Sequence, residues 1–181
     1  MLIDKNHWLA PIFSSHDGWT YQLVTTATPP DAFGASFSSL IALWASKRKD
    51  GNLPAWRDFD FSEFQDWWGW LTVIDLIAGP DLDGRFRLYG SDLVELLGRE
   101  LTGKTLRGDV LVSESNEDGY ESHDFDFLKD ISLKPAIGFA TGPVFWRNRE
   151  YLSITTVRLP LADDGVTVDR ILSGVRRFEA P

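Results

Sequence analysis

The stretch GRFRLYGSDLVELLGRELTGKT, residues 84–105, decides the fold. Its first part, Arg85–Tyr89, alternates polar and apolar residues in the way that a half-buried β-strand does. Gly90 ends this strand, and the serine and aspartate after it can cap a short helix, because their side-chain oxygens accept hydrogen bonds from free backbone N–H groups. Apolar residues then follow at helical spacing: Leu93, Leu96 and Leu97. The stretch therefore predicts a strand, a short helix and a glycine-rich exit.

The segments around this stretch predict an antiparallel sheet. Leu71–Ala78 is rich in β-branched residues, and Asp83-Gly84 is a tight-turn signal, so this segment and Arg85–Tyr89 are expected to form a hairpin. Three later segments have strand composition and are separated by turn signals: Pro135–Trp146, Tyr151–Pro160 and Val166–Phe178. The pattern is that of an α+β fold with five strands.

Two motifs carry a resemblance to a known family. The segment F-R-L-Y-G-S-D-L-V-E-L-L-G-R-E-L-T-G-K (residues 86–104) and the form L-P-x-x-x-D-F-D (residues 53–60) resemble PAS domains, in particular those of small bacterial stand-alone PAS proteins with an N-terminal helical extension. Two strands, short helices and three longer strands is also the order of elements in that family. The resemblance implies a PAS-like five-stranded antiparallel sheet with short helices on one face and an N-terminal helical cap. It further implies a sensory or regulatory role in signalling.

Before the predicted sheet, Asp31–Lys49 has the periodicity of an amphipathic helix. Its apolar residues form one stripe: Phe33, Phe37, Leu40, Ile41 and Trp44. Burial of each large side chain contributes roughly 1.5–3 kcal/mol, so this helix is expected to dock on a surface. One alternative is that it caps the sheet, and the other is that it forms the interface of a homodimer; the two are compatible. We expect residues 1–70 to form the extension and cap and residues 71–181 the core, packed as one globular unit.

Composition excludes several classes of function. The chain of 181 residues has no cysteine, which rules out disulfides, thiolate metal sites and the flavin–cysteine photochemistry of some PAS photosensors. Its formal net charge of −9 argues against binding of nucleic acid, which needs clustered lysine and arginine. There is neither an apolar run of membrane-spanning length nor a signal peptide at the start, so a cytoplasmic protein is expected. A chain of this length has no room for an output domain beside a PAS core, so any signal is expected to pass to a partner protein.

Motifs for catalysis and metal binding are missing. No nucleophile elbow, phosphate-binding glycine loop or paired-histidine metal motif is present, so we do not expect an enzyme. His123 has one specific alternative role. It lies before or within a predicted connector helix that runs to Pro135, and haem-binding PAS domains supply their iron ligand from that helix. The other alternative is an exposed imidazole among the carboxylates of its neighbours. No metal is predicted unless haem is bound at His123, and no other cofactor is required.

A ligand pocket, if present, has walls that follow from the strand and helix patterns. The predicted lining is Phe86, Leu88, Tyr89, Leu93, Leu96, Leu97, Phe125, Leu128, Phe139, Tyr151 and Ile154. Further candidates are Leu172 or Val175 for the wall, and Arg147 or Arg158 for orienting a polar ligand. We therefore expect a sensory module that binds a small molecule or a protein partner. A filled core that serves only dimerisation or protein interaction is the first alternative. An enzyme with buried His123 or Asp75 is the second.

Overall fold

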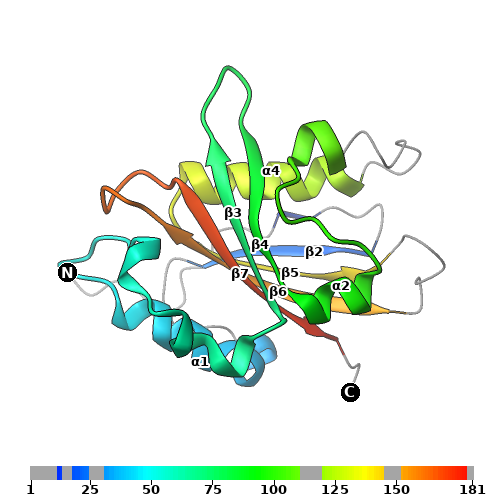
Figure 1. Ribbon diagram of the computed structural model, residues 1–181, viewed down its shortest axis with the longest axis horizontal. Coiled ribbons are helices and arrows are strands. Elements are labelled where there is room, and N and C mark those ends of the chain that lie inside the picture. The colour runs from blue at the N-terminus through cyan, green and yellow to red at the C-terminus, as the bar shows by residue number, and fades with distance from the viewer. Residues whose placement is uncertain (1–11, 14–17, 25–30, 111–119, 145–151, 179–181) are drawn as a thin grey trace.

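The computed structural model describes residues 12–13, 18–24, 31–110, 120–144 and 152–178 (Figure 1). Within these residues the chain forms a seven-stranded sheet in the order β1-β2-β5-β6-β7-β3-β4, and every neighbouring pair is antiparallel. The strands are β1 (Ile12–Phe13), β2 (Thr20–Val24), β3 (Leu71–Ile77), β4 (Asp83–Tyr89), β5 (Ile137–Pro143), β6 (Ser153–Leu161) and β7 (Arg170–Arg177).

The five strands expected from the sequence are all present, but the strand count was wrong. The N-terminal segment adds two strands at the β5 edge, because Thr20–Val24 pairs along its whole length with residues 137–141. The two-residue strand β1 pairs in turn with β2. These additions cover the edge of β5 that a five-stranded sheet would leave open.

Helices lie on both faces of the sheet (Figure 1). On one face, which we call the α1 face, lie α1 (Asp31–Ser46) and the 3₁₀ helices η1 (Trp56–Asp58) and η2 (Phe61–Trp67). On the other, which we call the α2 face, lie α2 (Ser91–Leu97), the short π-helix η3 (Leu106–Val110) and α4 (Tyr120–Leu133). Each face has its own cluster of buried apolar side chains. No helix among the described residues is long and apolar enough to cross a membrane.

The apolar stripe of α1 is buried against the sheet. Phe37, Leu40, Ile41 and Trp44 are all buried within the single chain. The Phe37 ring stacks on Trp67 of η2 at 5.7 Å between centroids, and the indole Nε1 of Trp44 donates a hydrogen bond of 2.9 Å to the carbonyl oxygen of Pro160 in β6. The side chain of Phe33 lies outside the described part of the chain. Four of the five residues predicted as a dimer interface are therefore already covered by the sheet, and a homodimer would have to use other surfaces.

A glycine lies beneath a helix on each face. A Cβ atom at Gly174 of β7 would lie 2.5 Å from Leu40 and 2.8 Å from Trp67, on the α1 face. A Cβ atom at Gly138 of β5 would lie 2.5 Å from Ile131 and 2.9 Å from Phe127, both in α4. Real Cβ atoms do not approach other heavy atoms this closely, so both glycines are needed for the helices to pack on the sheet.

Docking of α1 leads to a first prediction. Trp44→Ala removes a large buried side chain and is expected to lower the free energy of unfolding by roughly 3–5 kcal/mol. Trp68→Ala is the matched control, because Trp68 is 52% exposed, and a loss of about 1 kcal/mol or less is expected there. Urea unfolding followed by circular dichroism measures both. Equal losses in the two variants would show that α1 does not depend on Trp44 for its packing.

Candidate ligand-binding cavity

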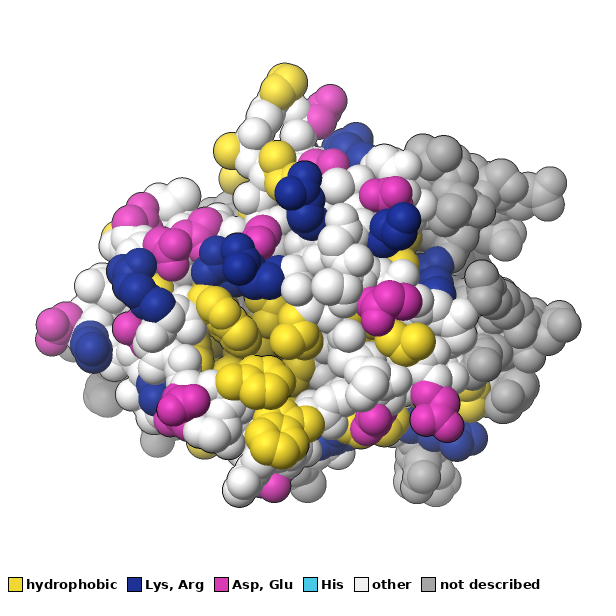
Figure 2. Space-filling view, viewed as in Figure 1, with side chains coloured by type: hydrophobic (Ala, Val, Ile, Leu, Met, Phe, Trp, Pro, Cys, Tyr) yellow, Lys and Arg dark blue, Asp and Glu magenta, His cyan; other side chains and the backbone are white. Residues whose placement is uncertain are grey.

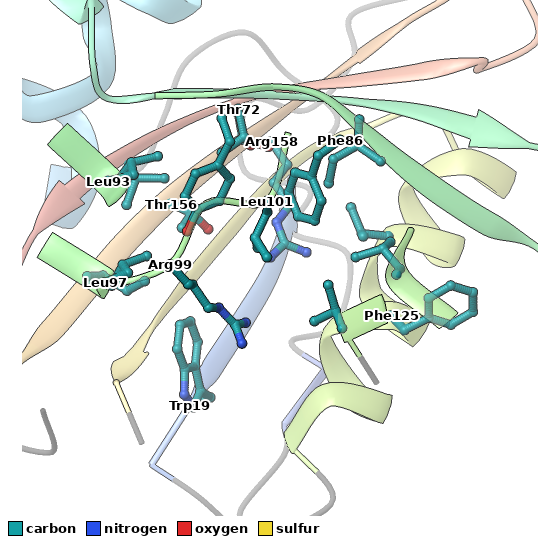
Figure 3. Close-up of a pocket in the computed structure, with 18 residues that line it drawn as sticks. Trp19, Thr72, Phe86, Leu93, Leu97, Arg99, Leu101, Phe125, Thr156 and Arg158 are labelled. Atoms are coloured by element: carbon teal, nitrogen blue, oxygen red, sulfur yellow. The ribbon is translucent and has the colours of Figure 1, made fainter. Parts of the chain in front are cut away.

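A cavity of about 130 Å³ lies between the α2 face of the sheet and the helices that cover it. β4, β3, β7 and β6 form its floor, and α2, η3 and α4 provide apolar side chains that close it (Figure 3). Seven of the residues predicted as pocket lining do line it: Phe86, Tyr89, Leu93, Leu97, Phe125, Leu128 and Ile154. The remaining walls come from Trp19, Ile74, Leu101, Leu106, Val110 and Val175 and from five polar residues described below.

The polar residues of the floor lie in one row across four strands. Tyr89 of β4 pairs with Thr72 of β3, Thr72 pairs with Ser173 of β7, and Ser173 pairs with Arg158 of β6. Directly paired residues of antiparallel strands project to the same face with Cβ atoms roughly 5 Å apart. All four line the cavity, and Thr156 joins them two residues before Arg158 on the same strand. The sheet thus presents adjacent hydrogen-bonding side chains to one small space.

These polar side chains are buried in an otherwise apolar layer. Among the described residues, the buried polar or charged ones are Thr72, Thr155, Thr156, Arg158 and Ser173, and all except Thr155 line the cavity. Burial of a polar group costs free energy unless hydrogen bonds replace those lost to water. A sheet selected only for packing would carry apolar residues at these positions, as the α1 face does at most of its buried positions, with Thr155 as an exception. A few polar groups within an apolar wall are the usual composition of a ligand-binding site, which makes this cavity the candidate site.

Tyr89 and Arg99 place two polar side chains next to each other near the C-terminal end of α2. Burial raises the pKa of Tyr89 to about 12, although the nearby Arg99 guanidinium, within hydrogen-bonding range of the phenol, acts in the opposite direction. The Tyr89 hydroxyl therefore stays protonated at neutral pH and can donate a hydrogen bond. Arg99 reaches this place because Gly98 ends α2 in the left-handed conformation at φ 74° and turns the chain.

Leu88 faces away from the cavity, contrary to the prediction. The expectation was that Phe86 and Leu88 share a face, as residues i and i+2 of a regular strand do. A β-bulge interrupts the pairing, since Val73 pairs with Leu88 whereas Ile74 pairs with Phe86. The extra residue, Arg87, reverses the alternation, so Leu88 packs with the apolar cluster of the α1 face. The same bulge brings Tyr89 onto the cavity face beside Phe86.

Three other predicted lining residues are placed differently. Phe139 points to the α1 face, because its neighbours Gly138 and Ala140 occupy the cavity side of β5. Leu96 is partly buried and packs against the cluster of the α2 face without lining the cavity. Tyr151 lies outside the described residues, as does the alternative orienting residue Arg147. Of the paired alternatives, Val175 and Arg158 line the cavity, while Leu172 packs on the α1 face.

Some cavity residues were not found by sequence reasoning. Thr72 and Ser173 lie in strand segments that were read only for their apolar pattern, and Arg99 lies in a predicted turn. Trp19 enters from the N-terminal segment that forms β2 and the residues before it. A signal was present for Thr72 and Ser173, since each is a hydroxyl residue in a strand segment whose other buried residues are Leu, Val, Ile or Gly.

Of the two residues considered for haem binding or catalysis, only Asp75 has a described side chain. The side chain of His123 in α4 lies outside the described side chains. Haem is also far larger than a benzene ring and needs a larger pocket than this one. Asp75 of β3 does not line the cavity and is paired with Arg87 Nε at 2.9 Å and with Arg170 Nε. Within the described residues, no group of three or more potential metal ligands occurs.

Comparison with known families gives one match. The family model described as a PAS domain matches residues 33–122, from α1 through β3, β4 and α2 into the start of α4. Residues 33–122 therefore belong to the PAS domain family, which indicates a sensory or regulatory module. Neither the curated proteins nor the solved structures contain a match to this chain. The match starts within α1, on the N-terminal side of the predicted domain boundary at residue 70, and that boundary stays a prediction.

The ion pairs of Asp75 lead to a second prediction. Partial burial raises the pKa of Asp75, but hydrogen bonds from Arg87 and Arg170 outweigh it and hold the pKa below its usual value. A lowered pKa in the folded state adds stability above the ordinary pKa of about 4, and this stability is lost as the pH falls below it. Asp75→Asn is therefore expected to reduce stability at pH 7 and to flatten the decline of stability between about pH 5 and pH 3.

Urea unfolding at a series of pH values measures this difference. Asp81→Asn, an exposed position in the turn between β3 and β4, is the control and should follow the unmodified protein. A curve for Asp75→Asn parallel to that of the unmodified protein would show that the ion pairs contribute nothing to the pH dependence.

Proposed function

We propose that this protein is a sensory module of the PAS family that binds a small molecule in the cavity of the α2 face. The observation that carries the proposal is the row of polar side chains on the floor of an apolar cavity: the buried Thr72, Ser173 and Arg158 and the partly buried Tyr89. A small number of placed polar groups within an apolar wall is the usual composition of a ligand site. A core that served only stability would gain nothing from them.

The same arrangement provides a route for a signal. The cavity is closed by side chains of α2, η3 and α4: Leu93, Leu97, Leu106, Val110, Phe125 and Leu128. A ligand that fills the space contacts all three helices at once, and these helices lie on the outside of the sheet (Figure 1). Ligand binding that favours one position of these helices would change the surface offered to a partner protein. Binding of a signalling partner protein and formation of a homodimer are also part of this proposal.

A protein-interaction module is the second candidate, and one observation favours it. Phe61 and Trp68, at the two ends of η2, are 51% and 52% exposed and stack with a ring separation of 5.9 Å. Figure 2 shows hydrophobic side chains gathered in one area of this side of the molecule. Exposed aromatic groups of this kind mark protein contacts. If they form an interface, Phe61→Ser with Trp68→Ser is expected to shift the protein to a smaller assembly in sedimentation velocity; an unchanged distribution removes this candidate.

Native mass spectrometry of the freshly purified protein tests the ligand-binding function. The unmodified protein is expected to carry a bound small mass, either as purified or after incubation with a set of benzene-sized neutral and charged compounds. Val175→Phe fills the cavity from its floor and should abolish this bound mass. Val166→Phe makes the same change at an exposed position and should keep it.

Circular dichroism confirms that Val175→Phe remains folded before the comparison is made. Bare protein mass in all samples of the folded protein would contradict a ligand-binding cavity. Equal retention of the ligand by Val175→Phe would place the ligand elsewhere.

A further inference from the structure

We infer that the cavity binds a small organic anion, namely a carboxylate whose apolar part is about the size of a benzene ring or a short branched chain. The inference rests on the proposed function, because it names the chemical class of the ligand for the same cavity. Three features carry it: the charge of the lining, the position of two arginines, and the volume.

The charged residues in the described part of the lining are all basic. The residues that line the cavity include two guanidinium groups, Arg99 and Arg158, and among the described residues that line it there is no aspartate or glutamate. Coulomb interactions are several-fold stronger in such a low-dielectric space than in water. An anionic ligand is therefore favoured over a neutral ligand of the same shape, and a cationic ligand is disfavoured.

Arg158 is fixed in the floor of the cavity. It is 7% exposed and lies in the middle of β6, between Gly138 of β5 and Ser173 of β7. Gly138 has no side chain, so Phe127 of α4 occupies that space, and the Arg158 guanidinium lies 5.3 Å from the centroid of the Phe127 ring. Contact with the ring supports a guanidinium in an apolar layer. Its hydroxyl neighbours Ser173 and Thr156 project from the same floor.

Arg99 approaches from the opposite wall. It follows the C-terminal end of α2, where Gly98 redirects the chain, and its guanidinium lies beside the Tyr89 hydroxyl. Figure 3 shows the ends of Arg99 and Arg158 in the middle of the ring formed by the lining side chains. A guanidinium has five N–H donors in a planar fork that fits the two oxygens of a carboxylate. Hydroxyl groups on the floor, including the protonated Tyr89, can donate hydrogen bonds to the same oxygens.

The volume limits the rest of the ligand. A cavity of about 130 Å³ is close to that of an engineered protein cavity of ~150 Å³ that binds benzene. Apart from Arg99, the wall opposite the polar row is apolar, with Leu93, Leu97 and Phe125 among its residues. Nucleotides and other ligands of drug size need roughly 300 Å³ or more. The space therefore fits one carboxylate together with one ring or a short branched chain.

Isothermal titration calorimetry with matched acids and amides tests the inference. The probes are benzoate and isovalerate, each compared with its neutral amide, benzamide and isovaleramide. At least one acid is expected to bind the unmodified protein, and its amide to bind roughly 10-fold or more weakly, because a hydrogen bond to a charged group is about twice as strong as a neutral one.

Substitutions of the two arginines test whether their guanidinium groups bind the carboxylate of the ligand. Arg158→Gln and Arg99→Gln are each expected to weaken binding of the acid by roughly 10- to 100-fold and to leave binding of the amide almost unchanged. Arg158→Lys keeps the charge and should lose less. Arg57→Gln is the control, because Arg57 lies on η1 at the α1 face with a side chain that is 69% exposed. If Arg158→Gln does not fold, Arg99→Gln and the comparison of acid with amide still decide the question.

The outcomes separate the two proposals. Amides that bind as well as the acids, or acid binding that survives both Gln substitutions, would overturn the anionic ligand and leave the ligand-binding cavity in place. Absence of binding by all four probes, together with bare protein mass in native mass spectrometry, would overturn both.

Discussion

Ser173 in β7 is paired with Thr72 of β3 on one side and with Arg158 of β6 on the other, and this register determines which side chains face the cavity. Because side chains alternate along a strand, a slip of one residue would move every one of them to the opposite face. The polar row would then lie against α1, and the residues that now pack there would face α2. The register is held by apolar residues on both faces, including Val73, Leu172 and Ile171, which are almost completely buried. The fold and the site therefore depend on the same set of hydrogen-bonded pairs.

The two faces of the sheet are used differently. The α1 face is filled by apolar and aromatic side chains, and its helix approaches closely over Gly174. The α2 face keeps an open volume and carries hydroxyl and guanidinium groups inside the same layer. Cavities and buried polar groups both reduce stability, so the α1 face has to provide the compensating packing. For this reason, substitution of Trp44 is expected to lower stability, and substitution of Arg158 is expected to weaken ligand binding.

Local patterns predicted the elements well. The period-2 alternation and turn signals placed the five core strands, and the apolar stripe at helical spacing placed α1, although this helix ends at Ser46 and not at Lys49. Six of the seven predicted residues that line the cavity belong to apolar faces whose direction follows from spacing; the seventh, Tyr89, faces the cavity because of the bulge in β4. The PAS family, inferred from residues 53–60 and 86–104, is confirmed by the family match.

The features that were not predicted depend on contacts between segments that are distant in the sequence. Leu88 changed face because a bulge against β3 adds one residue, and no local pattern in β4 shows that pairing. Phe139 was predicted to line the pocket, because alternation along β5 does not show which of its sides faces α4. On the side that does, Gly138 leaves room for Phe127 of α4. Pairing of Thr20–Val24 with β5 joins segments more than a hundred residues apart. Arg99 enters the site only because a left-handed glycine turns the chain after α2. Each of these depends on contacts between segments that sequence periodicity does not describe.

The most direct measurement is a crystal structure of the protein as purified, at a resolution that separates ordered water from a small organic molecule. The account predicts continuous electron density in the cavity, with a polar end between Arg99 and Arg158 and an apolar end against Leu93, Leu97 and Phe125. A cavity filled by repacked side chains, or one with only separate water molecules on the polar row, would contradict the central claim that this face of the sheet is a ligand site.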